Sequence, residues 1–170
     1  SNIPARSYLV RGIKVRIPSN ATVDSETGRL IYSGIWNGTF AAAQWTTCPA
    51  WCLYDLLTST RYGFGDHIDA AQLDKFAFYA ASVYANEQVA DGFGGLEARF
   101  SCSANIQTLE EAYKLINDMC SVFRAMPYWS AGAVTVAQDK PADPAASKCI
   151  SDLLDAVDAY IPEPVRELDK

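Results

Sequence analysis

Hydrophobic and polar residues alternate along the first part of the chain. From Ile3 to Ile17 apolar positions interchange with basic ones, which is the two-residue period of a strand with one buried face. The polar stretch Thr22–Thr27 predicts a loop, and Gly28–Ser33 predicts a short strand that closes a hairpin. The Asn37-Gly38 pair predicts a tight turn. Basic residues form the outer face of the first strand: Arg6, Arg11, Lys14 and Arg16.

A helical period follows Trp45. Pro49 suits the first position of a helix, where its missing N–H is not needed, and Thr47 or Cys48 would be the cap. Gly63 and Gly65 stop the chain from continuing as a helix. The apolar face of this predicted helix has four residues: Ala50, Leu53, Tyr54 and Leu57.

A second, longer helix is predicted after Asp69, which forms a capping-box pattern with Gln72. The glycine-rich stretch Asp91–Gly95 predicts a loop, and it lacks the glycine spacing of a dinucleotide-binding motif. Glu97–Ser103 predicts a strand after that loop. Apolar residues recur at the helical period in the second helix: Leu73, Phe76, Ala77, Ala80 and Tyr84.

The last part of the core combines one helix with one hairpin. Thr108 and Glu111 form another capping-box pattern, and Tyr128–Val136 predicts a hairpin that turns near Ser130–Gly132. The mixed order of strands and helices favours an α+β fold, with an N-terminal β hairpin, central helices and a small antiparallel hairpin. The buried face of the third helix would comprise Leu109, Ala112, Ile116, Met119, Cys120 and Phe123.

The pattern changes again near the C-terminus. Asp139–Pro144 is typical of a linker, and the residues after it predict an amphipathic helix. Ile161–Lys170 contains two prolines and alternating charges, which predicts an extended tail. The helix would place one set of residues on its apolar face: Ile150, Leu153, Leu154, Val157 and Ile161.

The composition of the chain excludes some classes of function, although it says little about the fold. The 170 residues carry a net charge of −6, with a pI near 4.7, which disfavours nucleic-acid binding because that binding depends on neutralising phosphates. Hydrophobic residues make up 49% and charged residues 20%, as in globular proteins. No apolar run reaches the roughly 18 to 20 residues that cross a bilayer, so we expect a soluble protein without membrane insertion.

The cysteines do not predict a metal site. No two of the five are spaced as CxxC, and His67 is the only histidine that could join them, whereas zinc sites usually need four such ligands. We therefore expect no metal and no cofactor, and reduced thiols that suit synthesis in a cytosol. The five cysteines are Cys48, Cys52, Cys102, Cys120 and Cys149.

A few acidic residues leave catalysis open. His67 lies between Asp66 and Asp69, which could orient it as a general base, although a solvated loop histidine is the commoner case. A glycan hydrolase needs two carboxyl groups about 5 to 9.5 Å apart, and Asp66 with Asp69, or Glu110 with Glu111, could supply them. The same acids are equally explained as helix-start charges.

Five aromatic residues gather on and after the predicted first helix: Trp45, Trp51, Tyr54, Tyr62 and Phe64. Their rings could stack on sugars, as in a carbohydrate-binding module. Their placement favours packing in the core or in a subunit interface. No catalytic residue is expected among them.

Several short sequence segments, in a fixed order, resemble the central region of the host-specificity protein J family, the tail-tip proteins of lambda-like phages and prophages. The resemblance covers residues 3–143. It rests on six segments: Tyr8–Asn20, Gly28–Tyr32, Pro49–Leu57, Arg61–Gly65, Asp91–Gly95 and Ala137–Pro141.

The resemblance implies a virion structural protein of the tail tip, without catalytic residues. Proteins of this family assemble as trimers and form a hub with other tail-tip proteins, and they are made in the host cytoplasm. The resemblance implies that residues 1–40 form a β-rich segment of a neighbouring tail-hub domain and that residues 41–143 form an α+β tail-hub domain.

The C-terminal segment resembles a different family. Residues 150–170 are similar to the end of the GTPase domain of elongation factor Tu and its linker, but none of that family's nucleotide-binding motifs is present. Residues 144–170 are therefore predicted to be an appended helix and tail, with no GTPase activity.

Overall fold

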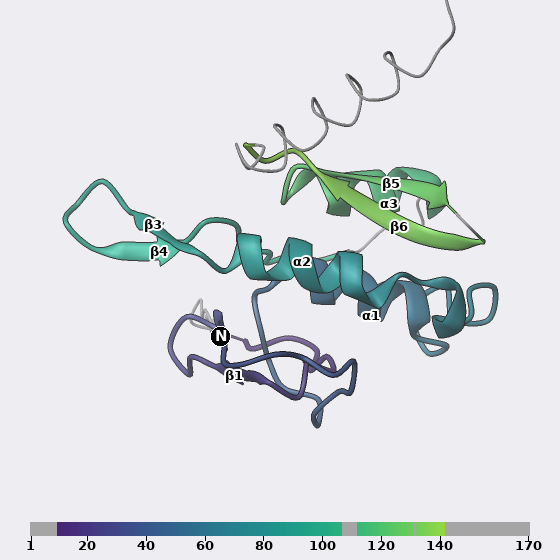
Figure 1. The fold of residues 1–170 in the computed structure, drawn as a ribbon, viewed down its shortest axis with the longest axis horizontal. Coiled ribbons are helices and arrows are strands. Elements are labelled where there is room, and N and C mark those ends of the chain that lie inside the picture. Colours follow the sequence, from purple (N-terminus) through teal and green to yellow (C-terminus); the bar gives the residue numbers. More distant parts are fainter. Residues whose placement is uncertain (1–9, 107–111, 131, 142–170) are drawn as a thin grey trace, which may run out of the picture. The chain divides into compact units, whose positions relative to one another are not determined.

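The computed structural model describes residues 10–106, 112–130 and 132–141, and its contacts divide the chain into two units, residues 1–138 and 139–170. The elements described below all belong to the first unit. Within the described residues there are three α-helices, a 3-10 helix (η1) and three two-stranded antiparallel sheets (Figure 1), which confirms the α+β class. The elements in chain order are β1 (Ala21–Val23), β2 (Leu30–Tyr32), α1 (Pro49–Thr58), η1 (Ala70–Gln72), α2 (Lys75–Ala85), β3 (Gln88–Ala90), β4 (Leu96–Ala98), α3 (Ala112–Ser121), β5 (Ala125–Ser130) and β6 (Ala133–Gln138).

The N-terminal hairpin differs from its prediction. Its first strand is β1, most of which lies in the stretch predicted as a loop, and it pairs with β2 from Ala21 opposite Tyr32. Residues 10–17 form no strand, although Val15 makes an isolated bridge to Gln44. The turn after β1 explains the difference, because the Asp24 carboxylate accepts backbone hydrogen bonds that close the chain there. Residues 1–9 lie outside the described part.

Helix α1 begins at Pro49, as predicted, with Cys48 as its N-cap residue. It is buried on most sides, which explains its largely apolar sequence. The helix ends at Thr58, before the two glycines, and the chain then turns back onto the last helical carbonyls. The Gly63 and Gly65 N–H groups each lie 3.1 Å from the Ser59 oxygen. The glycines therefore shape the returning turn after the helix has ended.

The predicted capping box at Asp69 is confirmed, but it opens only the single turn η1. The longer helix α2 begins at Lys75, where the Asp74 carboxylate accepts two backbone N–H groups. Between them the chain is extended, because the Asp74 N–H donates to the Val134 oxygen at 2.9 Å. This tertiary hydrogen bond separates Leu73 from the helix that follows. The predicted apolar face is therefore confirmed only in part: Leu73 is buried and Ala77 packs against the core. The residues buried on α2 are Phe78, Ala81, Ser82 and Ala85, whereas Phe76 and Ala80 are exposed.

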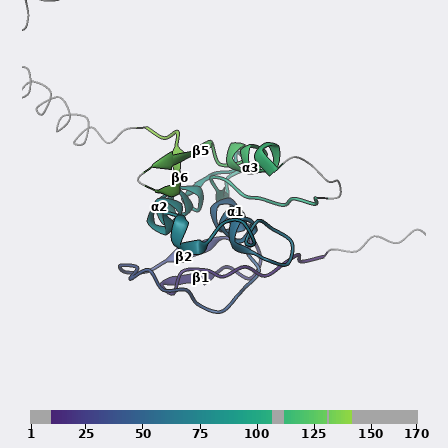
Figure 2. The same ribbon diagram turned by 90° about the vertical axis from the view of Figure 1, so that its right-hand side faces the viewer.

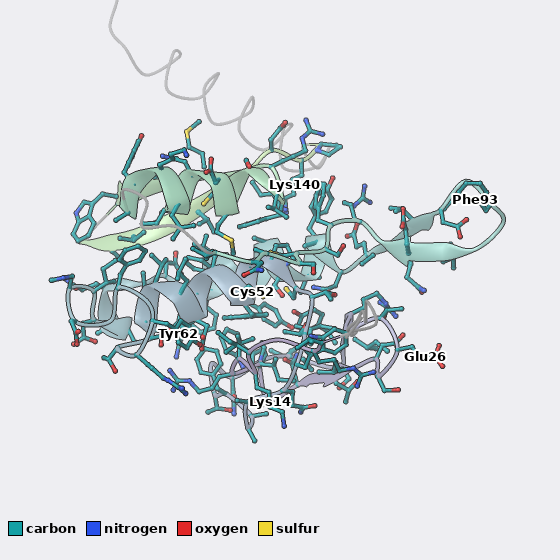
Figure 3. All side chains as sticks on the ribbon, turned by 180° about the vertical axis from the view of Figure 1, so that it is seen from behind. Lys14, Glu26, Cys52, Tyr62, Phe93 and Lys140 are labelled. Carbon is teal, nitrogen blue, oxygen red and sulfur yellow. The ribbon has the colours of Figure 1, made fainter. Side chains whose placement is uncertain are left out.

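Strands β3 and β4 form a hairpin at the C-terminal end of α2, with the predicted glycine-rich loop between them. Strand β4 is shorter than its prediction, since it ends at Ala98. The Phe100 N–H donates to the Ala85 oxygen, which ties the returning chain to the end of α2. Figure 3 shows Phe93 at the tip of this hairpin.

Helix α3 and the β5–β6 hairpin complete the unit. The hairpin is confirmed, with Trp129 paired to Val134, and it begins earlier than predicted, at Ala125. Helix α3 is confirmed too, but of its predicted buried face Ala112 is exposed. The capping residues Thr108 and Glu111, the apolar position Leu109 and the predicted C-terminal helix and tail lie outside the described residues. The most buried members of that face are Met119, Cys120 and Phe123.

The core is centred on aromatic rings. Helices α1 and α2 lie side by side between the N-terminal segment and the β5–β6 hairpin (Figure 2). Trp36 stacks on Tyr79 with ring centroids 4.9 Å apart and meets Trp51 at 5.7 Å in an edge-to-face arrangement. Such pairs add about 0.5 to 1.5 kcal/mol beyond the burial of their area. None of the helices in the described ranges has the length and hydropathy needed to span a membrane.

Candidate functional site

The five aromatic residues singled out in the sequence divide between core and surface. Trp51 is fully buried, which closes its ring to a sugar or a partner, and Tyr54 is nearly buried. Phe64 packs against the same core from its edge. Trp45 is half-buried, with the Arg11 guanidinium 4.8 Å from its ring centre. Tyr62 is the most exposed of the five, at 43%, and its hydroxyl donates to the Asp55 carboxylate.

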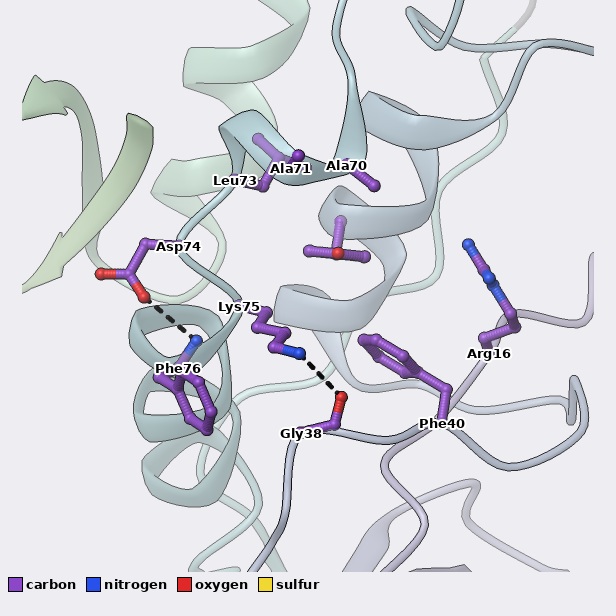
Figure 4. Close-up of a pocket in the computed structure, with 10 residues that line it drawn as sticks. Arg16, Gly38, Phe40, Ala70, Ala71, Leu73, Asp74, Lys75 and Phe76 are labelled. Atoms are coloured by element: carbon purple, nitrogen blue, oxygen red, sulfur yellow. Dashed lines mark hydrogen bonds between the residues drawn. The ribbon is translucent and has the colours of Figure 1, made fainter. Parts of the chain in front are cut away.

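An open aromatic hollow of about 500 Å³ lies beside Tyr54 (Figure 4). We call this the aromatic hollow. Its volume is within the range of ligand pockets, and its walls come from the N-terminal segment, α1, η1 and the start of α2. The residues that line it are Arg16, Gly38, Phe40, Tyr54, Ala70, Ala71, Leu73, Asp74, Lys75 and Phe76.

The charges of the aromatic hollow favour an apolar group with an acidic neighbour. The Lys75 ammonium donates to the Gly38 oxygen at 2.9 Å and lies 5.5 Å from the Phe76 ring. The Arg16 guanidinium lies 5.6 Å from the Phe40 ring. The Asp74 carboxylate faces the first turn of α2, where it accepts from the Phe76 N–H at 3.1 Å. Two cations beside aromatic rings are thus the main chemical feature of the hollow.

The candidate catalytic residues lie around a second, more polar hollow of about 390 Å³. His67 and Asp66 are exposed on its rim, and the Asp69 carboxylate accepts the Ala71 N–H at 2.9 Å as part of the η1 cap. This supports the structural explanation for Asp69. The other candidate pair, Glu110 and Glu111, lies outside the described residues. Within the described ranges, no group of three histidine, cysteine or acidic side chains could hold a metal ion.

Two thiols lie together beside the start of α1. The Cys102 N–H donates to the Thr47 oxygen at 2.8 Å, which holds this residue next to Cys52. The hydrogen bond between the thiols lowers the pKa of Cys102 to about 7 and, together with burial, raises the pKa of Cys52. Burial raises the pKa of Cys48 and brings that of Cys120 to about 11. No pattern of spacing predicted this pair, because 50 residues separate its members.

Cys102 should react first with a thiol reagent. The thiolate is the nucleophile, so alkylation of Cys102 by iodoacetamide should rise through about pH 7 and exceed that of Cys120 at neutral pH. Peptide mass spectrometry on a Cys149→Ser background measures each rate. Cys52→Ala removes the stabilising donor and should move the midpoint of Cys102 up toward 9. Equal rates for Cys102 and Cys120 at pH 7 would contradict the prediction.

Large apolar side chains are exposed in several places that the sequence prediction missed. Phe93 is 98% exposed and Ile35 is 99% exposed, each on a loop. The β5–β6 hairpin exposes three more large side chains, Met126, Tyr128 and Trp129. The only sequence signal for Phe93 was an aromatic residue among glycines. Where such side chains form a contiguous patch, they mark interaction sites.

Comparison with known proteins identifies relatives over most of the chain. No family model matches. The chain is 44% identical over 144 residues to the tip attachment protein J of Escherichia phage SECphi27, which covers 85% of this chain and 12% of that protein. It is 35% identical over 140 residues to the tip attachment protein J of Escherichia phage SECphi4, covering 82% of this chain and 12% of that protein. The chain thus spans about an eighth of the length of these curated relatives. Identity at this level, over more than four fifths of the chain, confirms the resemblance found in the sequence: the chain belongs to the tip attachment protein J family of phages.

Proposed function

We propose that this chain is a structural module of a phage tail tip, which supports host attachment and DNA delivery through assembly and not through catalysis. The observation that carries this proposal is its relation, over 85% of its length, to a protein named for attachment at the tail tip. The exposed apolar side chains support it, because a structural module of an assembly leaves surface to be covered by its neighbours.

The partners proposed are other proteins of the tail tip, with three copies of the full protein forming a homotrimer in the virion. The protein is made in the host cytoplasm and then resides at the tail tip. The module needs neither a cofactor nor a bound nucleic acid in this role. Receptor binding is not assigned to this module.

The domain limits stay a prediction: residues 1–40 as part of a neighbouring hub domain, 41–143 as the α+β hub domain and 144–170 as an appendage. Ile17 and Trp36 pack in the same core as Trp51. The predicted border between residues 40 and 41 is therefore closely packed. The likeness of residues 150–170 to elongation factor Tu also stays a prediction.

Labelling of intact virions tests the role. An epitope tag on this chain, in the phage that encodes it, should be seen by immunogold electron microscopy at the distal end of the tail. An untagged phage is the control for background labelling. Label on the capsid, or absence of the chain from purified particles, would contradict the proposal. Clearing of purified peptidoglycan by the chain, abolished by Asp66→Asn or Asp69→Asn, would contradict a purely structural role.

A further inference from the structure

The β3–β4 hairpin is an arm that is firmly attached at its base. We define the arm as residues 87–99. The Arg99 guanidinium forms an ion pair with Glu87 at 2.8 Å and lies 4.4 Å from the centre of the Tyr84 ring. The backbone N–H of Arg99 also donates to the backbone carbonyl oxygen of Glu87, with 2.8 Å between nitrogen and oxygen. Arg99 thus connects the base of the arm to Tyr84 at the C-terminal end of α2, and this connection fixes the direction of the arm relative to the helix.

The tip of the arm is ordered around a carboxylate. Asp91 accepts the Phe93 N–H at 2.7 Å and the Gly95 N–H at 2.9 Å, and these hydrogen bonds lower its pKa. Gly92 and Gly94 take positive φ angles, of 81° and 95°, which other residues rarely adopt. This ordered loop holds the Phe93 ring almost fully in water (Figure 3). Within the described residues the ring is almost without packing, so it is available to contact another molecule.

The charges of the arm complement those of the aromatic hollow. The arm carries three carboxylates against one guanidinium, so its net charge is negative; Glu87 is paired with that guanidinium, the Asp91 carboxylate is turned into the tip, and Glu97 lies on β4. Its apolar surface comes from Phe93 and the exposed Leu96. The aromatic hollow offers the reverse combination, with two cations beside aromatic rings and its one carboxylate turned into α2. An acidic arm with an aromatic tip therefore complements this hollow in charge and in aromatic character.

The arm cannot fill the aromatic hollow of its own chain. The hollow lies at the N-terminal end of α2, at Lys75 and Phe76, whereas the arm leaves from the C-terminal end, beyond Ala85 (Figure 1). The 11 residues of α2 put about 16 Å between these ends, and the arm continues away from the helix. The complementary surfaces are at opposite ends of one element, which is the arrangement of a head-to-tail contact.

We propose that the arm of one copy of this chain docks in the aromatic hollow of a second copy, with Phe93 inserted between Phe40 and Phe76. Acidic groups of the arm then lie near Arg16 and Lys75 of the copy that receives it. A head-to-tail contact closes into a ring when the rotation between copies allows it, which agrees with the three copies proposed above. This inference rests on the proposed assembly role and names one of its interfaces.

Photo-cross-linking of the 170-residue chain tests the contact directly. A benzoylphenylalanine at position 93 is activated in an equal mixture of ¹⁵N-labelled and unlabelled protein at high concentration. The expected product joins residue 93 of one isotopic form to a peptide with Phe40 or Phe76 of the other form. Cross-links to other surfaces, cross-links within one copy, or a protein that stays monomeric without cross-links would overturn the proposal.

Variants separate the contact from a loss of folding. Phe93→Ser should weaken self-association, measured by sedimentation, by about tenfold or more, whereas Ile35→Ser, an equally exposed apolar residue, should leave it unchanged. Arg16→Glu and Glu97→Lys should each weaken it, and the two changes together should restore it. Failure of the pair to restore association would overturn the charge complementarity. Thermal unfolding of each variant checks that the fold is kept.

The two proposals can fail separately. Immunogold labelling of the virion reads out the tail-tip location without the arm, so a Phe93→Ser phage that still carries the label at its tail keeps the proposed function. If sedimentation shows that Phe93→Ser leaves the self-association of the chain unchanged, the arm contact is overturned while the tail-tip role stands.

Discussion

Replacement of Trp51 by alanine should lower the free energy of unfolding by about 3 to 5 kcal/mol, the usual cost of removing a large buried aromatic side chain. The ring is fully buried on α1 and meets Trp36, Phe40 and Tyr54 at centroid distances between 5.4 and 5.7 Å. Its Nε1–H donates to the Tyr32 hydroxyl at 3.2 Å. The substitution removes the contacts of this ring with Trp36 and Phe40 of the N-terminal segment and with Tyr54 of α1. It leaves a cavity between that segment and the helix.

Denaturant unfolding followed by circular dichroism measures this cost, and the chain offers a matched control. Trp129→Ala removes the same side chain from the β5–β6 hairpin, where 62% of the residue is exposed, and should change stability by no more than about 0.5 kcal/mol. Trp51→Phe keeps an aromatic ring and should cost less than Trp51→Ala. Equal costs for the two alanine variants would show that the aromatic cluster does not support the fold.

Local signals in the sequence predicted local structure well. Pro49 marked the start of α1, and the Asp69 and Gln72 pattern marked a real capping box, because both depend on backbone groups only a few residues away. The same pattern failed to predict how far the helix runs. The distant Val134 carbonyl takes the Asp74 N–H, and this keeps η1 and α2 apart.

The aromatic hollow could not be predicted from the sequence. Its walls bring together Arg16, Phe40, Tyr54 and Lys75, which lie on four separate segments and share no pattern of spacing. Tyr54 was singled out, but as one of a group whose members turn out to be divided between core and surface. Family resemblance predicted the function better than any candidate site did, because it depends on the order of several short sequence segments and does not require a site to be recognised.

The phrase RYGFG, residues 61–65, contributed to that resemblance, and the structure gives it a physical reason. The chain returns onto the end of α1 so closely that the Phe64 N–H donates to the Leu56 oxygen at 2.9 Å. A Cβ atom at Gly63 would overlap the Leu56 carbonyl oxygen and lie 2.8 Å from its carbon and 3.0 Å from the Ser59 oxygen. The contacts are with backbone atoms, so no side chain can rotate away to make room.

Gly63→Ala should therefore destabilise the protein by about 4 kcal/mol or more, in the range that only severe structural conflicts reach. Gly65→Ala should also be costly, because its Cβ would overlap the Thr58 carbonyl oxygen. Gly12→Ala is the matched control: its Cβ would have no atom within 4 Å, and its φ is not positive. This change should be neutral or slightly stabilising.

Urea unfolding of the three glycine variants, followed by circular dichroism, distinguishes packing from flexibility. If glycine serves at position 63 only to keep the chain flexible, alanine at positions 63 and 12 should have similar effects. If the returning turn is packed on α1, only the alanines at 63 and 65 should lower the urea midpoint. Helix α1 carries Trp51 and one wall of the aromatic hollow. A lower urea midpoint for these two variants would therefore show that the tightly packed glycine turn stabilises the helix at the centre of the fold.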